Sequence, residues 1–290
     1  MIYIVQTMDK GFFVSPRKWN FIQEQLGKEV CLLNVFTEND AVLNLIKPED
    51  TVIVQTRKEK IIQRIIASGA AHTGESQRTI FMTEDKDNVK QLLSECGILF
   101  PKTVTLDDVE DGHVYFVKPV KGYDSEGVDE CSLCRSKSEV IAKYRQLQAF
   151  AEEKNDEAFL PLIEEFIEGN ECTVAIFKKG DTTEAHGITI HLGNEFGIQT
   201  YKDKMSWSEW CEPNRNPLLL NAGVKAFDAV GCQHFMRIDF RETADGTPYL
   251  IDFNLYPGLG PIDHLAKCLA INKRTSYYDM LMTIAATAKR

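Results

Sequence analysis

Two apolar, strand-like runs flank an Asp-Gly dipeptide near the end of the chain, within residues 235–258 (FMRIDFRETADGTPYLIDFNLYPG). Asp-Gly between two such runs is typical of a β-hairpin, so this segment is predicted to form two antiparallel strands. A loop centred on Asp245-Gly246 places Asp239 directly opposite Asp252. Opposed side chains of this kind lie about 4.5–5.5 Å apart on one face.

The same register places Arg237 opposite Asn254, on the face that carries both aspartates. Facing carboxylates repel each other unless a cation neutralises them, and oxygen ligands suit Mg²⁺. The sequence therefore indicates a metal site formed by Asp239, Asp252 and Asn254. The alternative is a solvated acidic strand face, and a register shifted by one residue would separate these side chains.

Strand and helix signals alternate through the first seventy residues. The expected strands are 2–6, 30–36 and 51–56, and the expected helices begin at Pro16 or span 38–46 and 59–68. A βαβαβα order predicts a parallel sheet covered by helices. No GxGxxG follows the first strand, which argues against a dinucleotide cofactor.

The remaining chain is predicted to have an α+β organisation. The expected helices span 83–97, 138–153, 217–230 and 276–288. The expected strands include 114–119, 160–167, 173–178, 185–191, 235–240 and 249–254. This order predicts mixed sheets rather than a continued parallel sheet.

Two further segments carry weaker signals for a ligand. Lys118 ends an apolar strand and can reach a phosphate as a point charge, and the small residues of the loop 121–127 can fold over phosphates. An ordinary hairpin explains this loop equally well. The apolar run 160–167 leads to Glu171, which could hold a ribose diol, although a crossover between domains accounts for the same pattern.

Composition excludes several classes of protein. The net charge of −10 argues against a basic face for duplex nucleic acid, and no apolar run approaches the ~18 residues of a membrane span. The first residues lack a basic region and a cleavage site, so we expect a cytoplasmic protein. Cys131 and Cys134 form a CxxC without a second pair, so free thiols are expected rather than a zinc site or a redox pair.

Four segments, in this order, resemble the ATP-grasp superfamily and are most similar to its D-alanine–D-alanine ligase branch. They are Asp85-Lys86 with Lys90, VKPVKGYDSEGV (117–128), EEFIEGNECTV (164–174) and RIDF…YLIDFNLYPG (237–258). The resemblance covers roughly residues 83–285. It implies an ATP-grasp fold, with a parallel amino-terminal (pre-ATP-grasp) lobe at 1–82 and two α+β lobes, 83–166 and 167–290, that clamp ATP.

The resemblance also implies how ATP is held. Lys86, Lys118 and Lys204 would contact phosphates, with Ser125 and its loop above them. Glu164 would bind the adenine amino group. Backbone groups of Glu165 and Ile167 would contact adenine, and Glu171 would bind ribose. All of these positions are assigned from the family motifs.

The family motifs further imply two Mg²⁺ ions, with Mn²⁺ as a possible substitute, on Asp239, Asp252 and Asn254. Arg237 would stabilise the oxyanion of a tetrahedral intermediate, and Lys118 would assist phosphoryl transfer. A carboxylate would be activated as an acyl phosphate and then attacked by an amine. The implied protein is an ADP-forming carboxylate–amine ligase with small-molecule substrates, and the related enzymes imply a homodimer.

Several positions depart from the family pattern. Asp252 stands where Glu is usual, and Asp263 stands where a Ser after Pro257-Gly258 binds the second substrate's carboxylate. Gly258 allows close approach to a substrate. Asp124 and Met205 replace the Ser and Tyr that lock the lid loop, and the Glu that holds the first substrate's amine has no counterpart that we can place.

These departures lead us to expect an acceptor amine other than D-alanine, such as a cationic one, because Asp263 would repel a carboxylate. Three alternatives stay open: D-alanine–D-alanine ligase itself, a small-molecule kinase of the same fold, and a non-catalytic nucleotide-binding protein. Arg237 favours ligation over the kinase, since phosphoryl transfer to a hydroxyl forms no tetrahedral carbon. The set of lysines and metal ligands argues against a binding-only role.

Overall fold

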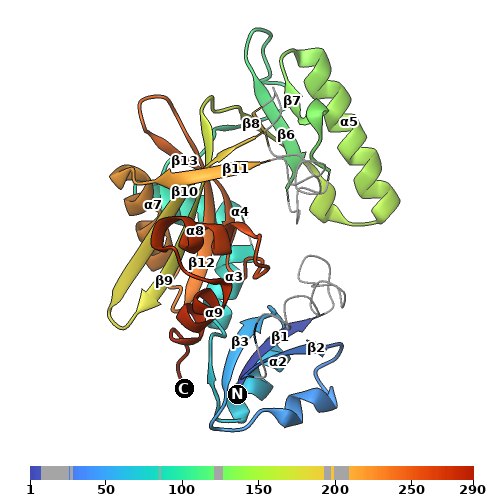
Figure 1. Cartoon of the computed structure of the whole chain (residues 1–290). Helices are drawn as coiled ribbons and strands as arrows, with labels where there is room; N and C mark the ends of the chain where they lie inside the picture. Colours follow the sequence, from blue (N-terminus) through green and yellow to red (C-terminus); the bar gives the residue numbers. More distant parts are fainter. Residues whose placement is uncertain (8–25, 27–28, 85, 121–126, 193–196, 199–208) are drawn as a thin grey trace.

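The computed structural model describes residues 1–7, 26, 29–84, 86–120, 127–192, 197–198 and 209–290, apart from the side chains of residues 84, 86–88 and 158. These residues form three sheets flanked by helices (Figure 1). Within the described residues, no helix is long and apolar enough to cross a membrane.

The amino-terminal sheet is parallel, with the order β2-β1-β3-β4. Its strands are β1 (Ile2–Thr7), β2 (Val30–Val35), β3 (Thr51–Gln55) and β4 (Ala71–His72). The middle of β3 is apolar and fully buried, as expected for a parallel strand covered on both faces. The predicted parallel sheet is therefore confirmed. The expected helix at Pro16 lies outside the described residues.

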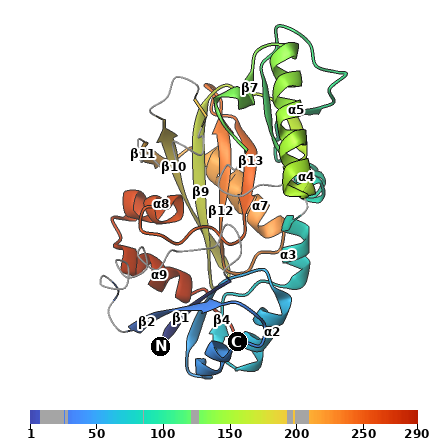
Figure 2. The ribbon, with the colours of Figure 1, turned by 90° about the vertical axis from the view of Figure 1, so that its right-hand side faces the viewer.

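Helices complete this part of the chain. Helix α2 (Glu59–Ala67) matches the prediction, whereas the helix expected at 38–46 is a short 3-10 turn, η2 (Ala41–Leu45). The single helix expected at 83–97 is instead two helices, α3 (Gln77–Glu84) and α4 (Lys86–Glu95). They lead from the amino-terminal sheet to the next one (Figure 2).

The middle sheet is antiparallel, with the order β5-β8-β6-β7. Its strands are β5 (Thr103–Val104), β6 (Tyr115–Pro119), β7 (Leu133–Cys134) and β8 (Pro161–Glu165). Short 3-10 turns, η3 (Glu130–Ser132) and η4 (Glu157–Phe159), flank helix α5 (Lys137–Lys154), which packs on this sheet. Ser136 caps the start of α5, and Asn155 ends it in the left-handed conformation.

The carboxy-terminal sheet is antiparallel, with the order β11-β10-β9-β12-β13. Its strands are β9 (Asn170–Lys179), β10 (Thr182–His191), β11 (Trp210–Asn214), β12 (Phe235–Glu242) and β13 (Pro248–Asn254). Helix α7 (Pro217–Ala229) and helix α8 (His264–Lys273) pack on it, and α9 (Tyr277–Ala285) packs on α8. Alternate β9 residues enter the two cores, Val174 that of α7 and Ala175 that of α8, so these helices cover opposite faces.

All eight cysteines are free, as predicted. Cys131 is exposed and Cys134 is buried. Burial raises the pKa of the Cys134 thiol to about 12, which makes a thiolate at this position unfavourable. The division of the chain into three lobes at the expected boundaries stays a prediction.

Candidate active site

The hairpin that carries the acidic residues has the predicted register where it matters. Arg237 pairs with Asn254 and Asp239 with Asp252 across β12 and β13. Next to the turn, however, Phe240 pairs with Leu250, so the register shifts at a β-bulge and Ile251 is the additional residue. The hairpin loop is therefore centred on Asp245 and not between Asp245 and Gly246, so the predicted centre was wrong by half a residue. The extra residue of the bulge then restores the predicted pairing of Asp239 with Asp252.

Hydrogen bonds gather these side chains into one cluster. Arg237 Nη2 donates to Asp239 Oδ2 at 2.8 Å. Asn254 Nδ2 donates to the Oδ2 atoms of Asp239 at 3.3 Å and Asp252 at 3.1 Å. Thr173 Oγ1 donates to Asp239 Oδ1 at 2.7 Å. The side chains predicted to share one face are therefore brought together.

The Arg237 guanidinium lies at the centre of this negative charge. Burial alone would lower its pKa, but Asp239, Asp252 and Asp263 outweigh that effect and raise it. Its Nε is buried and has no hydrogen-bond partner within the described part of the chain. A buried, charged donor without a partner can stabilise an oxyanion on a bound substrate.

The cluster suits a hard divalent cation. Two carboxylates and one amide are oxygen donors of the type that Mg²⁺ prefers. The described residues contain no group of three or more His, Cys, Asp or Glu that could hold a metal. The expected site uses two such residues and the Asn254 amide, and this ligand set stays a prediction. This amide already reaches both carboxylates. Rotating it by half a turn would present Oδ1 to a metal between them.

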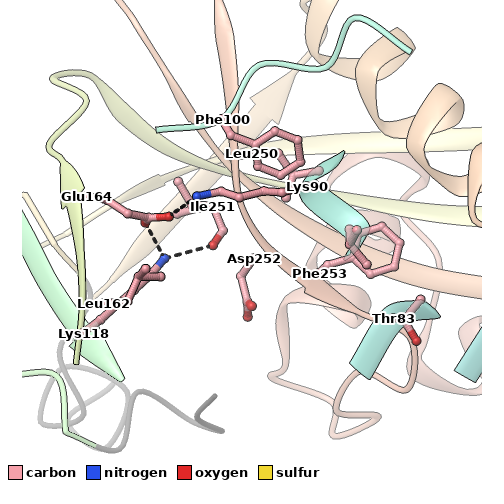
Figure 3. A pocket seen from close by; sticks show the side chains of 11 residues that line it. Thr83, Lys90, Phe100, Lys118, Leu162, Glu164, Leu250, Ile251, Asp252 and Phe253 are labelled. Atoms are coloured by element: carbon pink, nitrogen blue, oxygen red, sulfur yellow. Dashed lines mark hydrogen bonds and ion pairs between the residues drawn. The ribbon is translucent and has the colours of Figure 1, made fainter. Parts of the chain in front are cut away.

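A cleft of about 530 Å³, including space open to solvent, has Asp252 of this cluster in its lining. Figure 3 shows the side chains that line it. Its lining combines apolar side chains with two lysines and two acids: Thr83, Val89, Lys90, Phe100, Lys118, Leu162, Glu164, Leu250, Ile251, Asp252 and Phe253. Asp252 thus belongs to both the acidic cluster and the cleft. Two lysines and one proposed metal donor therefore line the same cleft.

Glu164 of β8 connects the two lysines. Its Oε1 pairs with Lys90 Nζ at 2.7 Å and its Oε2 with Lys118 Nζ at 2.8 Å. Burial would raise the pKa of Glu164, but Lys118 and Lys90 outweigh it and hold the pKa below its usual value. Lys118 Nζ also donates to the carbonyl of Ile251, the bulge residue, at 3.4 Å.

Lys90 belongs to the first family motif, but the sequence analysis assigned it no role of its own. The resemblance assigned the phosphate contact to Lys86, which begins α4 and whose side chain lies outside the described part. Lys90, one turn later, lines the cleft. The available signal was their spacing of four residues, which places both on one helix face. Ser125 and Lys204 also lie outside the described residues.

Of the residues expected around adenine and ribose, Glu164 lines the cleft, whereas Glu165, Ile167 and Glu171 lie at the end of β8 and the start of β9 and do not line it. The Glu165 carboxylate pairs with Lys102 at 3.4 Å, and its backbone N–H donates to the Lys102 carbonyl. Ile167 follows β8, and Glu171 pairs across the sheet with Arg241. Their role toward a nucleotide stays a prediction.

Arg241 fixes this connection, which the sequence did not indicate. Its guanidinium donates to the carbonyls of Gly169 and Gly197, each at 2.6 Å, and lies 4.5 Å from the centre of the Phe166 ring. Gly169 has φ +147°, and a Cβ there would lie 2.0 Å from the Glu242 carbonyl oxygen. Only glycine allows this close approach of the connection to β12.

The expected acceptor residues form a tight turn before α8. A Cβ at Gly258 would lie 2.7 Å from Asp263 Oδ2, and that oxygen accepts the Gly260 N–H. Asp263 is therefore held against Gly258, near enough to Arg237 to influence its pKa. Asp124 and Met205, the lid departures, lie outside the described residues.

Comparison with known proteins decides the family. The model of the family described as "D-ala D-ala ligase C-terminus" matches residues 107–285, more than half of the chain. The chain belongs to the D-alanine–D-alanine ligase family. The resemblance found in its motifs is thereby confirmed.

Curated relatives agree with this assignment. A D-alanine–D-alanine ligase of Cupriavidus metallidurans is 27% identical over 76% of this chain and 68% of its own length. Another, from Anaeromyxobacter dehalogenans, is 26% identical over 81% of this chain and 78% of its own. D-alanine–D-alanine ligase A of Mesorhizobium japonicum is 31% identical over 64% of this chain and 55% of its own.

Solved structures show the same fold over nearly the whole chain. A D-alanine–D-alanine ligase from Bacillus anthracis, complexed with ATP, has a TM-score of 0.68 at 21% identity and covers 99% of this chain and 96% of its own. The VanG D-Ala:D-Ser ligase from Enterococcus faecalis has a TM-score of 0.69 at 17% identity, with 99% and 98% covered. The expected ATP-grasp fold is confirmed, and the chain is an ATP-dependent, ADP-forming ligase of this type.

Proposed function

We propose that this ligase joins a small-molecule carboxylate to an amine, with an acyl phosphate as intermediate and ADP and phosphate as by-products. The supporting observation is that Asp252 belongs both to the acidic cluster and to the cleft lined by Lys90 and Lys118. The two lysines and one proposed metal donor therefore line the same cleft, and Asn254 links Asp252 to Asp239, which pairs with Arg237.

Lys90 and Lys118 are proposed to bind the phosphates of ATP. Glu164 now neutralises both ammonium groups and keeps them aimed into the cleft, which suits a site that must accept an anion. Two Mg²⁺ ions, or Mn²⁺, held by Asp239, Asp252 and Asn254 would neutralise charge on the transferred phosphoryl group. The remaining residues of the proposed nucleotide site follow the family motifs: Lys86, Ser125 and Lys204 at the phosphates, Glu164, Glu165 and Ile167 at adenine, and Glu171 at ribose.

Arg237 is proposed to stabilise the oxyanion when the amine attacks the acyl phosphate. Its unpartnered Nε and raised pKa give it a donor and a permanent charge for this step. A kinase that transfers phosphate to a hydroxyl forms no such oxyanion, so this residue favours ligation. A lid of the surrounding lobes would keep water from hydrolysing the acyl phosphate.

For the acceptor, we propose an amine that does not present a carboxylate to Asp263, such as a cationic one. Asp263 stands beside Gly258 and adds negative charge near Arg237. The second candidate is D-alanine–D-alanine ligase activity itself, which the names of the curated relatives favour. The D-Ala:D-Ser ligase among the solved structures is an enzyme of this fold with another acceptor.

The proposal also divides the chain into three lobes, with ATP between the second and the third. It further includes a homodimer formed through the first lobe, and both features rest on the family resemblance. A cytoplasmic location stays a prediction.

An ADP-release assay tests the reaction. D-alanine is supplied with ATP and Mg²⁺, alone and with D-serine, D-ornithine or a diamine. ADP formation that requires both a carboxylate and an amine supports ligation, and a preference for a cationic amine supports the role of Asp263. Efficient ADP release with D-alanine alone and formation of its dipeptide would overturn the proposed acceptor. A stable phosphorylated product, or no turnover with any pair although ATP binds, would overturn the ligase reaction.

A further inference from the structure

Glu75 is a buried acid that no step of the proposed reaction uses. It lies between β4 and α3, where the chain leaves the amino-terminal sheet, and only 3% of its surface is exposed. A buried carboxylate is costly unless donors surround it. The groups that surround this carboxylate belong to the carboxy-terminal sheet.

The Glu75 carboxylate binds the segment that enters β12. Its Oε1 accepts the backbone N–H of Gln233 at 2.9 Å and of His234 at 3.1 Å, and the Cys232 thiol at 3.0 Å. Its Oε2 accepts the Gln233 N–H at 3.1 Å. These residues directly precede β12, the strand that carries Arg237 and Asp239. The carboxylate thus fixes where that strand begins.

The backbone of the same residue binds the other end of the hairpin. The Glu75 N–H donates to the Tyr256 hydroxyl at 3.1 Å. Tyr256 is buried and follows Asn254 by two residues, where the chain leaves β13. One residue of the amino-terminal part therefore contacts the segment that enters β12 and the segment that leaves β13, at the end of the hairpin where the metal donors lie.

We propose that Glu75 is a positioning residue that sets the spacing of Asp239, Asp252 and Asn254 by holding both strands of their hairpin against the amino-terminal sheet. The proposal rests on the metal site proposed above. Hydrogen bonds beyond the ligands fix their orientation and affect metal affinity. Glu75 acts one step further out, through the backbone, because it touches neither a metal donor nor the cleft.

The shape of the contacts explains why this residue is an acid. Two backbone N–H groups and a thiol converge on the carboxylate, and an amide in its place would direct N–H groups against some of these donors. The Gln233 and His234 N–H groups would then lose an acceptor, and the entrance to β12 would move. Tyr256→Phe is the corresponding change next to β13, and it is smaller because it removes only the hydrogen bond from the Glu75 N–H to the Tyr256 hydroxyl.

The test compares Glu75→Gln, Tyr256→Phe and the control Glu38→Gln. Glu38 lies in the turn after β2, its side chain is 44% exposed, and it pairs with Lys60. Mn²⁺ binding in the presence of ADP is measured by electron paramagnetic resonance, without turnover, and folding is checked by circular dichroism. We expect Glu75→Gln to weaken Mn²⁺ binding about tenfold, at the lower end of effects from residues behind metal ligands. Tyr256→Phe should weaken it less, and Glu38→Gln should not change it.

The outcomes separate this proposal from the proposed function. Normal Mn²⁺ binding by folded Glu75→Gln and by Tyr256→Phe would overturn the positioning role. If Glu75→Gln does not fold, Tyr256→Phe decides: weaker binding supports the role, and unchanged binding overturns it. Failure of the unaltered protein to bind Mn²⁺ with ADP would instead refute the metal site on which the proposal depends.

Discussion

Replacing Lys90 with alanine distinguishes the structural assignment of the helix lysine from the assignment made on sequence. Lys90 Nζ lies 2.7 Å from Glu164 Oε1 and 2.8 Å from Thr103 Oγ1. The Lys90 side chain is 22% exposed and that of Glu164 is 5% exposed. Lys86→Ala is the matched control, since it removes the same charge one turn earlier on the same helix.

The expected loss of stability follows from these contacts. A hydrogen bond to a charged group contributes about 1.5–3 kcal/mol. Glu164 keeps Lys118 in the variant, so the full cost of an unpaired buried charge does not apply. We therefore expect Lys90→Ala to lower the free energy of unfolding by about 2 kcal/mol at neutral pH.

The effect should depend on pH in a defined direction. The pKa of Glu164 is lower in the folded protein than in the unfolded chain, so its ion pairs stabilise the fold above the unfolded pKa. This stability is lost as the pH falls through the folded-state pKa. Lys90→Ala removes part of that pKa difference. The free energies of unfolding of the variant and the unaltered protein should therefore become more similar as the pH falls below about 4.

Urea unfolding at several pH values and ATP-dependent ADP release measure both consequences. We expect Lys90→Ala to raise the KM for ATP about tenfold, which corresponds to 1.4 kcal/mol of lost binding, and Lys86→Ala to leave stability nearly unchanged. The reasoning is refuted if Lys90→Ala unfolds at the same urea concentration as the unaltered protein. It is equally refuted if Lys86→Ala impairs ATP use more than Lys90→Ala.

Three further changes probe other parts of the site. Asp252→Asn should raise the Mg²⁺ concentration for half-maximal activity at least tenfold, measured by titration, since one of two carboxylates is lost. Gly258→Ala should destabilise the protein by about 1–3 kcal/mol in urea unfolding, because Asp263 must move away from the new methyl group and lose its hydrogen bond from the Gly260 N–H. Adding Asp263→Ala to this variant should remove the contact between the methyl group and the carboxylate and restore part of the stability. Burial would raise the pKa of Glu209, but its contact with His264 helps lower it to about 2, so stability should fall as the pH drops from 4.5 towards 2. Glu209→Gln should flatten that acid-induced decline.

The acidic hairpin was predictable because its pattern is local. Strand alternation and one Asp-Gly turn were enough to bring Asp239 and Asp252 together, and both are paired in the structure. The bulge at Ile251 was not predictable, since no residue type in that apolar run marks it. Its carbonyl nevertheless receives Lys118, a contact that depends on the bulge's place in three dimensions.

Contacts between distant segments were beyond sequence reasoning. Lys86 and Lys90 are equivalent by helical spacing, and the ion pair of Lys90 with Glu164, far along the chain, could not be predicted from that spacing. Glu75 lacks any local motif, because its partners lie more than 150 residues away. Helix α8 was also missed, although Asp263 at its start is a residue type that favours the N-cap position. The alternation of apolar residues within single strands and helices could be recognised in the sequence, whereas the contacts between different parts of the chain could not.

Transfer of oxygen from the carboxylate to phosphate tests the central claim most directly. D-alanine labelled with ¹⁸O in its carboxylate is incubated with ATP, Mg²⁺ and the amine selected by the ADP-release assay, and the released phosphate is analysed by mass spectrometry. Activation through an acyl phosphate predicts one ¹⁸O atom in each released phosphate. ADP release with unlabelled phosphate would contradict the proposed reaction.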